Sequence, residues 1–300
     1  MADDPSSKNM LPAYLSSSSA GTFVQCPQKW KFRYIDRLPD PPGRAALLGT
    51  FAHAVLEHLF QERPESRTKE KAIAIATSLW PQMDNNPDFI ALDLSDAEKI
   101  EFKHDCKSAF TGVWQIEKYD PQMVEVESTE RDVKVQLGDV PFRGIIDLVH
   151  RENGELIVSD FKSGKKPRSA RDKEEKMKQV LLYAAALLEA DKEAVNKVRL
   201  VFIGEKTNVD IESDVTELSL EKPIEELNQT WNELQTACND GSFETRTSAL
   251  CEWCPYVLEC FNGYKQVIGR YIQGKVRADA PALKLMGLNG YTLTGESLEG

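Results

Sequence analysis

The stretch PFRGIIDLVHRENGELIVSDFKS, residues 141–163, decides the fold. Apolar residues run through both of its halves, and the Asn-Gly pair at 153–154 is the dipeptide that most favours a tight hairpin turn. We therefore predict two strands joined by this turn. Because side chains alternate between the two faces of a strand, Asp147 shares a face with apolar neighbours on the first strand, and Asp160 and Lys162 share a face on the second.

These three charged side chains extend a face that is otherwise apolar. Burying a charge without a partner costs several kcal/mol, so the charges need either mutual pairing or a metal ion to offset them. Two interpretations follow from the residues alone. One is an ordinary cross-strand ion pair at the end of a sheet, and the other is a divalent-metal site with a lysine beside it.

Composition narrows the class of protein. The chain has 300 residues, of which 41% are apolar and 28% charged, as expected for a globular protein with a sizeable core. Its first ten residues, MADDPSSKNM, lack the basic and apolar segments of a secretory signal, and the longest apolar run, Val180–Leu188, is too short to span a bilayer. We therefore expect a cytoplasmic protein with no membrane contact. The net charge of -11 argues against non-specific coating of nucleic acid.

A local basic segment nevertheless follows the hairpin. Eight basic and only three acidic residues lie between Lys162 and Lys178. Such a run is compatible with a solvated loop and helix face, and it is also compatible with contacts to phosphates. Lys165, Lys166 and Arg168 are the candidate DNA-binding residues.

The order of the predicted elements indicates the architecture. A strand pair within 122–137 leads into the hairpin, a helix covers 174–190, and another strand covers 197–204. This order predicts an α/β fold, a mixed sheet with a crossover helix. The regions that we expect are a disordered stretch at 1–12, a helical region at 13–121, the core at 122–220, a helix and cysteine cluster at 221–265, and a tail with one short helix and a mobile end at 266–300. We expect the chain to fold as one domain.

Two predicted helices carry polar residues at helical spacing. His53 and Glu57 share a face of a helix over 47–62, and Gln179 and Tyr183 share a face of the helix over 174–190. A lone helical histidine is more often a packed or solvated side chain than a ligand. Taken singly, these residues do not specify a function.

A second specific signal is ALCEWCPYVLECFNG, residues 249–263, in which Cys251, Cys254 and Cys260 have the spacing Cys-x2-Cys-x5-Cys. In a cytoplasmic chain, cysteines this close together are metal ligands rather than disulfide partners. Cys26 is the candidate fourth ligand, because Pro27 begins a helix and leaves Cys26 at a junction between two helices. Four thiolates suit either zinc or a [4Fe-4S] cluster.

Together these motifs resemble the PD-(D/E)XK nuclease superfamily, and within it the RecB-like branch with four cysteines, which includes CRISPR-associated RecB-like exonucleases and the AddB nuclease domain. The resemblance covers the chain from about Ser16 to Cys260. It is carried by the motifs Gly49-x3-His53, Asp147 in GIIDLV, Asp160-x-Lys162, Gln179-x3-Tyr183 and the four cysteines.

The resemblance implies a restriction-endonuclease-like fold and a metal site. His53, Asp147, Asp160 and the main-chain carbonyl of Phe161 would bind Mg2+ or Mn2+. Lys162 would act on the attacking water and the transition state, and Gln179 and Tyr183 would line the DNA channel and brace the site. Glu57 is a candidate for indirect contact with the metal. The four cysteines would hold a structural [4Fe-4S] cluster, with zinc the less favoured alternative.

The activity implied is metal-dependent exonuclease cleavage of DNA, with single strands as the expected substrate. One alternative is an end-trimming subunit of a recombination or CRISPR spacer-acquisition complex, and another is a non-catalytic DNA-binding module. The sequence has no Gly-x4-Gly-Lys-Ser/Thr loop, so a helicase or integrase-type partner would have to supply any unwinding. Two positions depart from the family pattern. Asp160 stands where many relatives have Glu, and Ile146 stands where the superfamily name has Pro.

Overall fold

The computed structural model describes residues 11–117, 119–204 and 209–288. The chain divides into two compact units. Unit 1 combines the residues up to Asp40 with those from Gln229 onward, and unit 2 runs from Pro41 to Asn228. Of the stretch 1–12 that we predicted to be disordered, the structure describes only Leu11 and Pro12, which are half-buried. The predicted mobile C-terminal end lies outside the described residues.

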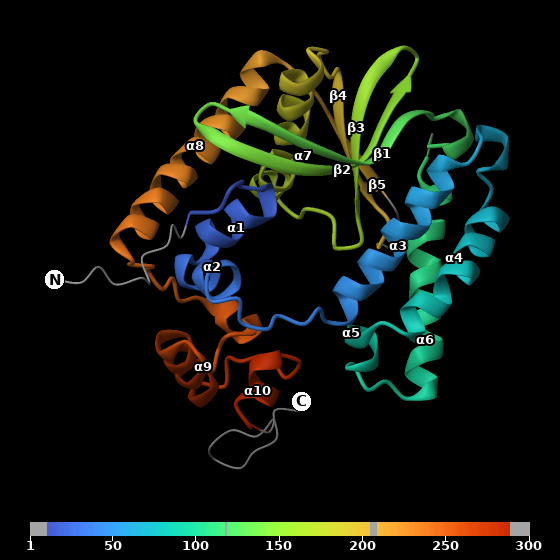
Figure 1. Ribbon diagram of the computed structural model, residues 1–300. Helices are drawn as coiled ribbons and strands as arrows, with labels where there is room; N and C mark the ends of the chain where they lie inside the picture. Colours follow the sequence, from blue (N-terminus) through green and yellow to red (C-terminus); the bar gives the residue numbers. More distant parts are fainter. Residues whose placement is uncertain (1–10, 118, 205–208, 289–300) are drawn as a thin grey trace. The chain divides into compact units, whose positions relative to one another are not determined.

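Unit 2 is built on a mixed sheet of five strands in the order β1-β2-β3-β4-β5 (Figure 1). The strands are β1 (Glu125–Leu137), β2 (Val140–Glu152), β3 (Glu155–Lys162), β4 (Lys197–Phe202) and β5 (Val209–Asp214). Only the β3–β4 pair is parallel, and the other neighbours are antiparallel. This architecture confirms the predicted α/β fold with a mixed sheet flanked by helices.

The hairpin of β2 and β3 forms as the sequence predicts. Asn153 and Gly154 have φ angles of 52° and 84°, as a type I′ turn requires, and Arg151 pairs with Leu156 beside the turn. The parallel β3–β4 pair then requires a crossover connection. Helix α7 (Ala170–Asp191) supplies it, with Ser169 as its N-cap.

The N-terminal half of unit 2 contains α3 (Arg44–Gln61), α4 (Lys69–Asp84), α5 (Pro87–Ile90) and α6 (Asp96–Phe110), with short 3-10 turns at Pro64–Ser66, Thr111–Gln115 and Pro121–Met123. Helix α3 packs on the sheet, α4 and α6 pack on α3, and α5 packs on α4. Phe161 of β3 stacks on Phe60 of α3, with ring centroids 5.8 Å apart, and Leu148 and Val201 join the same apolar core. This packing fixes α3 beside the strands that carry the two aspartates.

Unit 1 contains α1 (Ser17–Gln25), α2 (Pro27–Tyr34), η4 (Ala249–Trp253), α9 (Phe261–Ile272), α10 (Pro281–Leu285) and the last part of α8 (Glu217–Asp240). Ser16 caps α1 through Ser19, and Pro27 opens α2, so Cys26 lies at the helix junction as predicted. Trp30 is buried between Phe23, Tyr34 and Phe243, and its ring N–H donates to Ser19 Oγ at 2.9 Å.

Three local predictions are wrong. Residues 125–137 form one long strand and not a strand pair, because all of β1 pairs with β2. The edge strand β5 was not predicted, since its short sequence VDIESD contains only two apolar residues, Val209 and Ile211. The region after Cys260 holds two helices, α9 and α10, and not one.

None of the helices within the described ranges is both long and apolar enough to cross a membrane.

Gly204, two residues after β4, allows a very close backbone approach in unit 2. A Cβ atom at this position would lie 1.9 Å from the carbonyl oxygen of Ser163, and the neighbouring Ile203 N–H donates to the carbonyl of Lys162 at 2.9 Å. The segment that follows Lys162 is therefore held directly against the end of β4. Only glycine permits this spacing.

We predict that Gly204→Ala destabilises unit 2, because the contact is with backbone that cannot rotate away. The expected loss in unfolding free energy is about 1–3 kcal/mol, measured as a lower thermal midpoint. Gly164→Ala is the matched control, since a Cβ there meets no atom within 4 Å. Equal midpoints for the two variants would contradict the prediction.

Candidate metal centre

The two aspartates lie on adjacent strands. Asp147 in β2 and Asp160 in β3 are the residues next to the paired Leu148 and Ser159 in the antiparallel register. Asp160 is only 2% exposed, whereas Asp147 is partly accessible. The hairpin turn sets this register, so the Asn-Gly pair indirectly determines the separation of the two carboxylates.

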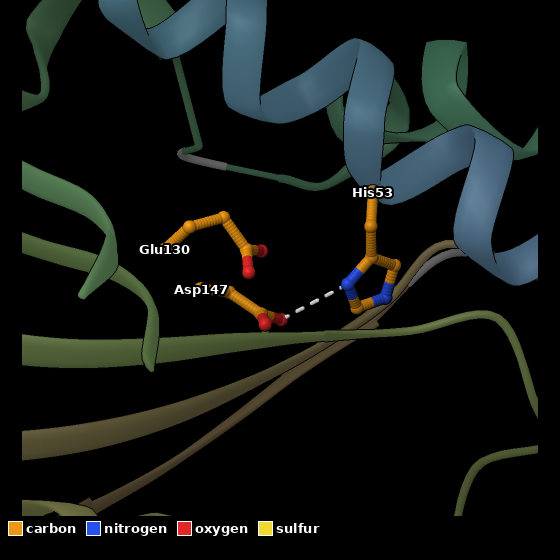
Figure 2. A group of neighbouring side chains, drawn as sticks. All are labelled: His53, Glu130 and Asp147. Carbon is orange, nitrogen blue, oxygen red and sulfur yellow. Dashed lines mark ion pairs between the residues drawn. The ribbon is translucent and has the colours of Figure 1, made fainter. Parts of the chain in front are cut away.

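Helix α3 brings a histidine to the first aspartate. His53 Nδ1 lies 3.4 Å from Asp147 Oδ2, and the same oxygen accepts the backbone N–H of Phe161 at 2.7 Å (Figure 2). Burial disfavours the charged imidazolium, but the hydrogen bond to Asp147 and the negative charges of Asp147 and Asp160 outweigh this effect and raise the pKa of His53. The imidazole therefore sits in a strongly negative environment.

A glycine lets α3 approach this closely. Gly49 lies one helical turn before His53, and a Cβ there would be 2.7 Å from Ser163 Oγ. The Gly-x3-His pattern thus combines the close approach of the helix with the placement of the imidazole on the same helix face.

The lysine lies between the second aspartate and helix α7. Lys162 Nζ is 2.7 Å from Asp160 Oδ2 and donates to Gln179 Oε1 at 2.8 Å. Gln179 Nε2 in turn donates to Tyr183 Oη at 2.8 Å. The structure therefore brings Lys162, Gln179 and Tyr183 together in one hydrogen-bonded chain.

The ammonium of Lys162 does not fully compensate Asp160. Burial and the nearby charge of Asp147 raise the pKa of Asp160 to about 6, although Lys162 and His53 act in the opposite direction. Oδ2 is within ion-pair distance of Lys162 but lacks a well-aligned hydrogen bond, and it has no other partner among the described residues. A buried, under-satisfied carboxylate oxygen beside a second carboxylate suits a cation.

Two residues of the site were not singled out from the sequence. Glu130 of β1 joins His53 and Asp147 in a group whose ligand atoms all lie within 4.8 Å of one another (Figure 2). Gly144 of β2 makes room for the ring of Tyr183, since a Cβ there would be 2.7 Å from Cε1. Glu130 lies in the polar stretch STERD, which gave no periodic signal. Gly144, by contrast, is the first residue of the GIIDLV motif, and a glycine inside a strand indicates a site of close approach.

The remaining predicted residues lie around this centre. Lys165, Lys166 and Arg168 are exposed on the loop between β3 and α7. Farther along the basic segment, Lys176 and Lys178 form ion pairs with acidic neighbours. Glu57 accepts a hydrogen bond from Gln61 at 3.3 Å and is not part of the group around His53.

All four candidate cysteine ligands line one pocket of unit 1, together with Lys29, Ser248 and Gly263. Backbone N–H groups of Ser248 and Gly263 donate to the sulfurs of Cys251 and Cys260, at 3.5 and 3.3 Å. A Cβ at Gly263 would lie 3.2 Å from Cys260 Sγ and 4.0 Å from Cys251 Sγ. The sulfurs are not tightly clustered, since no three of them within the described ranges lie within 4.8 Å of one another.

Comparison with known proteins agrees with this geometry. The family model of the PD-(D/E)XK nuclease superfamily matches residues 14–260. A crystal structure from Eubacterium rectale named "Putative exonuclease" has a similar fold, with a TM-score of 0.52, 11% identity, and coverage of 82% of this chain and 88% of that chain. The crystal structure of SSO0001 is 17% identical over 72% of this chain and 95% of that chain, with a TM-score of 0.29 that is too low to support an argument.

Comparison with curated proteins gives no match. The family match extends over most of the sequence and contains every residue of the centre described above, from His53 to Tyr183, as well as all four cysteines of the unit 1 pocket. The chain belongs to the PD-(D/E)XK nuclease superfamily.

Proposed function

We propose that this protein is a metal-dependent DNA exonuclease of the RecB-like branch that acts on single strands. One observation carries the proposal: His53, Asp147, Asp160 and Lys162 converge in one site of a PD-(D/E)XK fold. The Gly49-x3-His53 and Gln179-x3-Tyr183 motifs support the assignment to this branch, because both contribute side chains to the same site.

The donor set fits a hard divalent cation. His53, Asp147, Asp160 and the main-chain carbonyl of Phe161 would hold Mg2+ or Mn2+, and a histidine among oxygen ligands shifts preference toward Mn2+. When bound, such a cation lowers the pKa of a water molecule and polarises the scissile phosphate.

Lys162 has the position of the residue that assists attack. Its ammonium group can orient the water and stabilise the negative charge that builds on the phosphate oxygens as the new P–O bond forms and the old one breaks. Gln179 accepts a hydrogen bond from this ammonium, and Tyr183 accepts one from Gln179. Both residues therefore position Lys162, while water supplies the oxygen and the proton that the leaving alkoxide takes up.

The loop after β3 offers a route for the substrate backbone. Lys165, Lys166 and Arg168 are exposed on the segment that directly follows Lys162. Basic side chains there would bind phosphates on either side of the cleaved bond. These basic side chains would attract the DNA backbone locally, although the net charge of -11 repels DNA at longer range.

We also propose that Cys26, Cys251, Cys254 and Cys260 hold a [4Fe-4S] cluster that stabilises unit 1. A zinc ion with bonds of about 2.3 Å would need sulfurs about 3.8 Å apart, closer than the arrangement in this pocket. In a four-iron cluster each thiolate binds a different iron, so the sulfurs lie farther apart. Burial raises the pKa of Cys251 and Cys254, and binding to iron would offset the cost of their ionisation.

The general test is digestion of single- and double-stranded DNA labelled at either end, with and without Mg2+ or Mn2+. We expect cation-dependent release of nucleotides from the ends of single strands. Release that continues in excess EDTA would contradict the proposal, and so would cleavage confined to internal sites.

Asp160→Asn should abolish cleavage and raise the stability of the metal-free protein. Because the folded-state pKa of Asp160 lies above that of the unfolded chain, the aspartate favours the folded state least above pH 6 and progressively more as the pH falls from about 6 toward 4. In EDTA, the variant should therefore melt several degrees higher than the wild type at pH 7.5, and the difference should shrink at pH 4.5.

The control for this experiment is addition of Mn2+. It should raise the melting temperature of the wild type and have a much smaller effect on Asp160→Asn. A variant that digests DNA normally, or one whose melting temperature equals that of the wild type at both pH values, would refute the role of this carboxylate.

Lys162→Ala should lower kcat by several orders of magnitude and change substrate affinity little, because the ammonium acts on the attacking water and the transition state. Lys165→Ala is the matched control from the exposed loop, for which we expect weaker DNA binding and a nearly unchanged single-turnover rate at saturating DNA. The prediction fails if Lys162→Ala alters only DNA affinity.

Cys254→Ala should remove the cofactor and destabilise unit 1, because metal binding and folding are coupled in such sites. We expect the anaerobically purified wild type to be brown, with four irons per chain by analysis, and the variant to be colourless. Cys238→Ala is the matched control, since Cys238 is a buried thiol of α8 outside the pocket. Stoichiometric zinc in the wild type would contradict the cluster assignment.

A further inference from the structure

Glu130 is an acidic residue of the candidate metal centre that none of the recognised nuclease motifs contains. Its carboxylate, Asp147 and His53 each offer one ligand atom, and these atoms all lie within 4.8 Å of one another. Figure 2 shows the three side chains converging from separate segments, with the Glu130 carboxylate directed toward that of Asp147. Asp160 is outside this group and lies instead against Lys162.

The distances between the ligand atoms of His53, Glu130 and Asp147 are close to those found around a bound cation. Around an octahedral ion with bonds of about 2.1 Å, neighbouring ligand atoms lie about 3.0 Å apart and opposite ones about 4.2 Å apart. A slight closure of the His53–Glu130–Asp147 group therefore completes a ligand set of one nitrogen and two oxygens. That combination suits Mn2+ better than Mg2+.

The charge balance around Glu130 also points to a cation. Glu130 is exposed to solvent, its carboxylate lies beside that of Asp147, and among the described residues no ion pair or hydrogen bond compensates it. The carboxylate thus faces a like charge at short range, and a divalent ion would reverse this repulsion.

The backbone supports the assignment. Glu130 has φ of +46°, a left-handed conformation that is unfavourable for a glutamate, and it lies in β1 opposite Asp147, between the pairs Thr129–Leu148 and Arg131–Ile146. In a regular strand, side chains alternate between the two faces. The left-handed backbone angle at Glu130 interrupts this alternation, and the Glu130 side chain points toward Asp147.

We propose that Glu130 is a ligand of the divalent cation, together with His53 and Asp147. This inference rests on the proposed function, because it extends the same metal site. Glu130 would then add a ligand to the set already proposed, which consists of His53, Asp147, Asp160 and the main-chain carbonyl of Phe161. Cation affinity, and not only catalysis, depends on β1.

The test is Mn2+ binding to the full-length protein without DNA. Binding is measured by calorimetry and, independently, from the electron paramagnetic resonance signal of free Mn2+. Glu130→Gln should lower Mn2+ affinity at least tenfold. Glu125→Gln is the matched control, because Glu125 is an exposed glutamate of the same strand that is not part of the group. Its affinity should stay within twofold of the wild type.

A second variant separates ligand loss from misfolding. Glu130→Asn should also lose Mn2+ affinity, while its thermal midpoint in EDTA should be equal to or above that of the wild type, because asparagine tolerates the left-handed conformation. Equal Mn2+ affinity for Glu130→Gln and the wild type would overturn the inference.

The outcomes also separate this inference from the proposed function. If Asp147→Asn abolishes Mn2+ binding and cleavage while both Glu130 variants keep them, the nuclease proposal stands and the role of Glu130 is refuted. If the wild type neither binds Mn2+ nor cleaves DNA, both are refuted.

Discussion

Two carboxylates on adjacent strands, Asp147 and Asp160, are the constraint on which the rest of this structure depends. Asp147 also lies close to Glu130, and the basic groups beside the two aspartates are Lys162 and His53. Burial raises the pKa of Asp160 to about 6 despite the ion pair with Lys162. The site is therefore built at a cost in stability, which the surrounding core has to offset. Perturbed pKa values of this kind cluster at functional sites.

The topology follows from how these charges are presented. A hairpin turn fixes the register of Asp147 against Asp160, and the parallel pairing of β3 with β4 requires the crossover through α7. Because that helix returns across the sheet, Gln179 lies within hydrogen-bond distance of Lys162, and Tyr183 lies within hydrogen-bond distance of Gln179. Glycines permit the close approaches, Gly49 at Ser163 and Gly144 at the tyrosine ring. The motif residues are thus joined by packing, although the chain separates them by more than 130 positions.

Strong local signals explain what was predictable from the sequence. The Asn-Gly turn specifies the hairpin, and the apolar run at the start of 155–162 specifies a buried strand. The apolar periodicity of α3 and α7 specifies each helix and its buried face. Strand β5 escaped prediction because an edge strand with one solvated face carries few apolar residues. Glu130 escaped it for another reason, since its role depends on a left-handed backbone angle and on tertiary proximity to α3, and neither leaves a periodic pattern.

The number of acidic groups near Lys162 and Asp160 distinguishes a structural ion pair from a metal site. A structural ion pair would join Lys162 to Asp160 and leave no further acid nearby, because additional carboxylates only add repulsion. Here, Asp147 lies near Asp160, Glu130 lies near Asp147, and an imidazole with a raised pKa lies 3.4 Å from Asp147. An arrangement that accumulates acidic groups around one partly exposed point loses stability without a cation and gains it with one. That asymmetry favours a site shaped for a metal ion over one shaped for the fold alone.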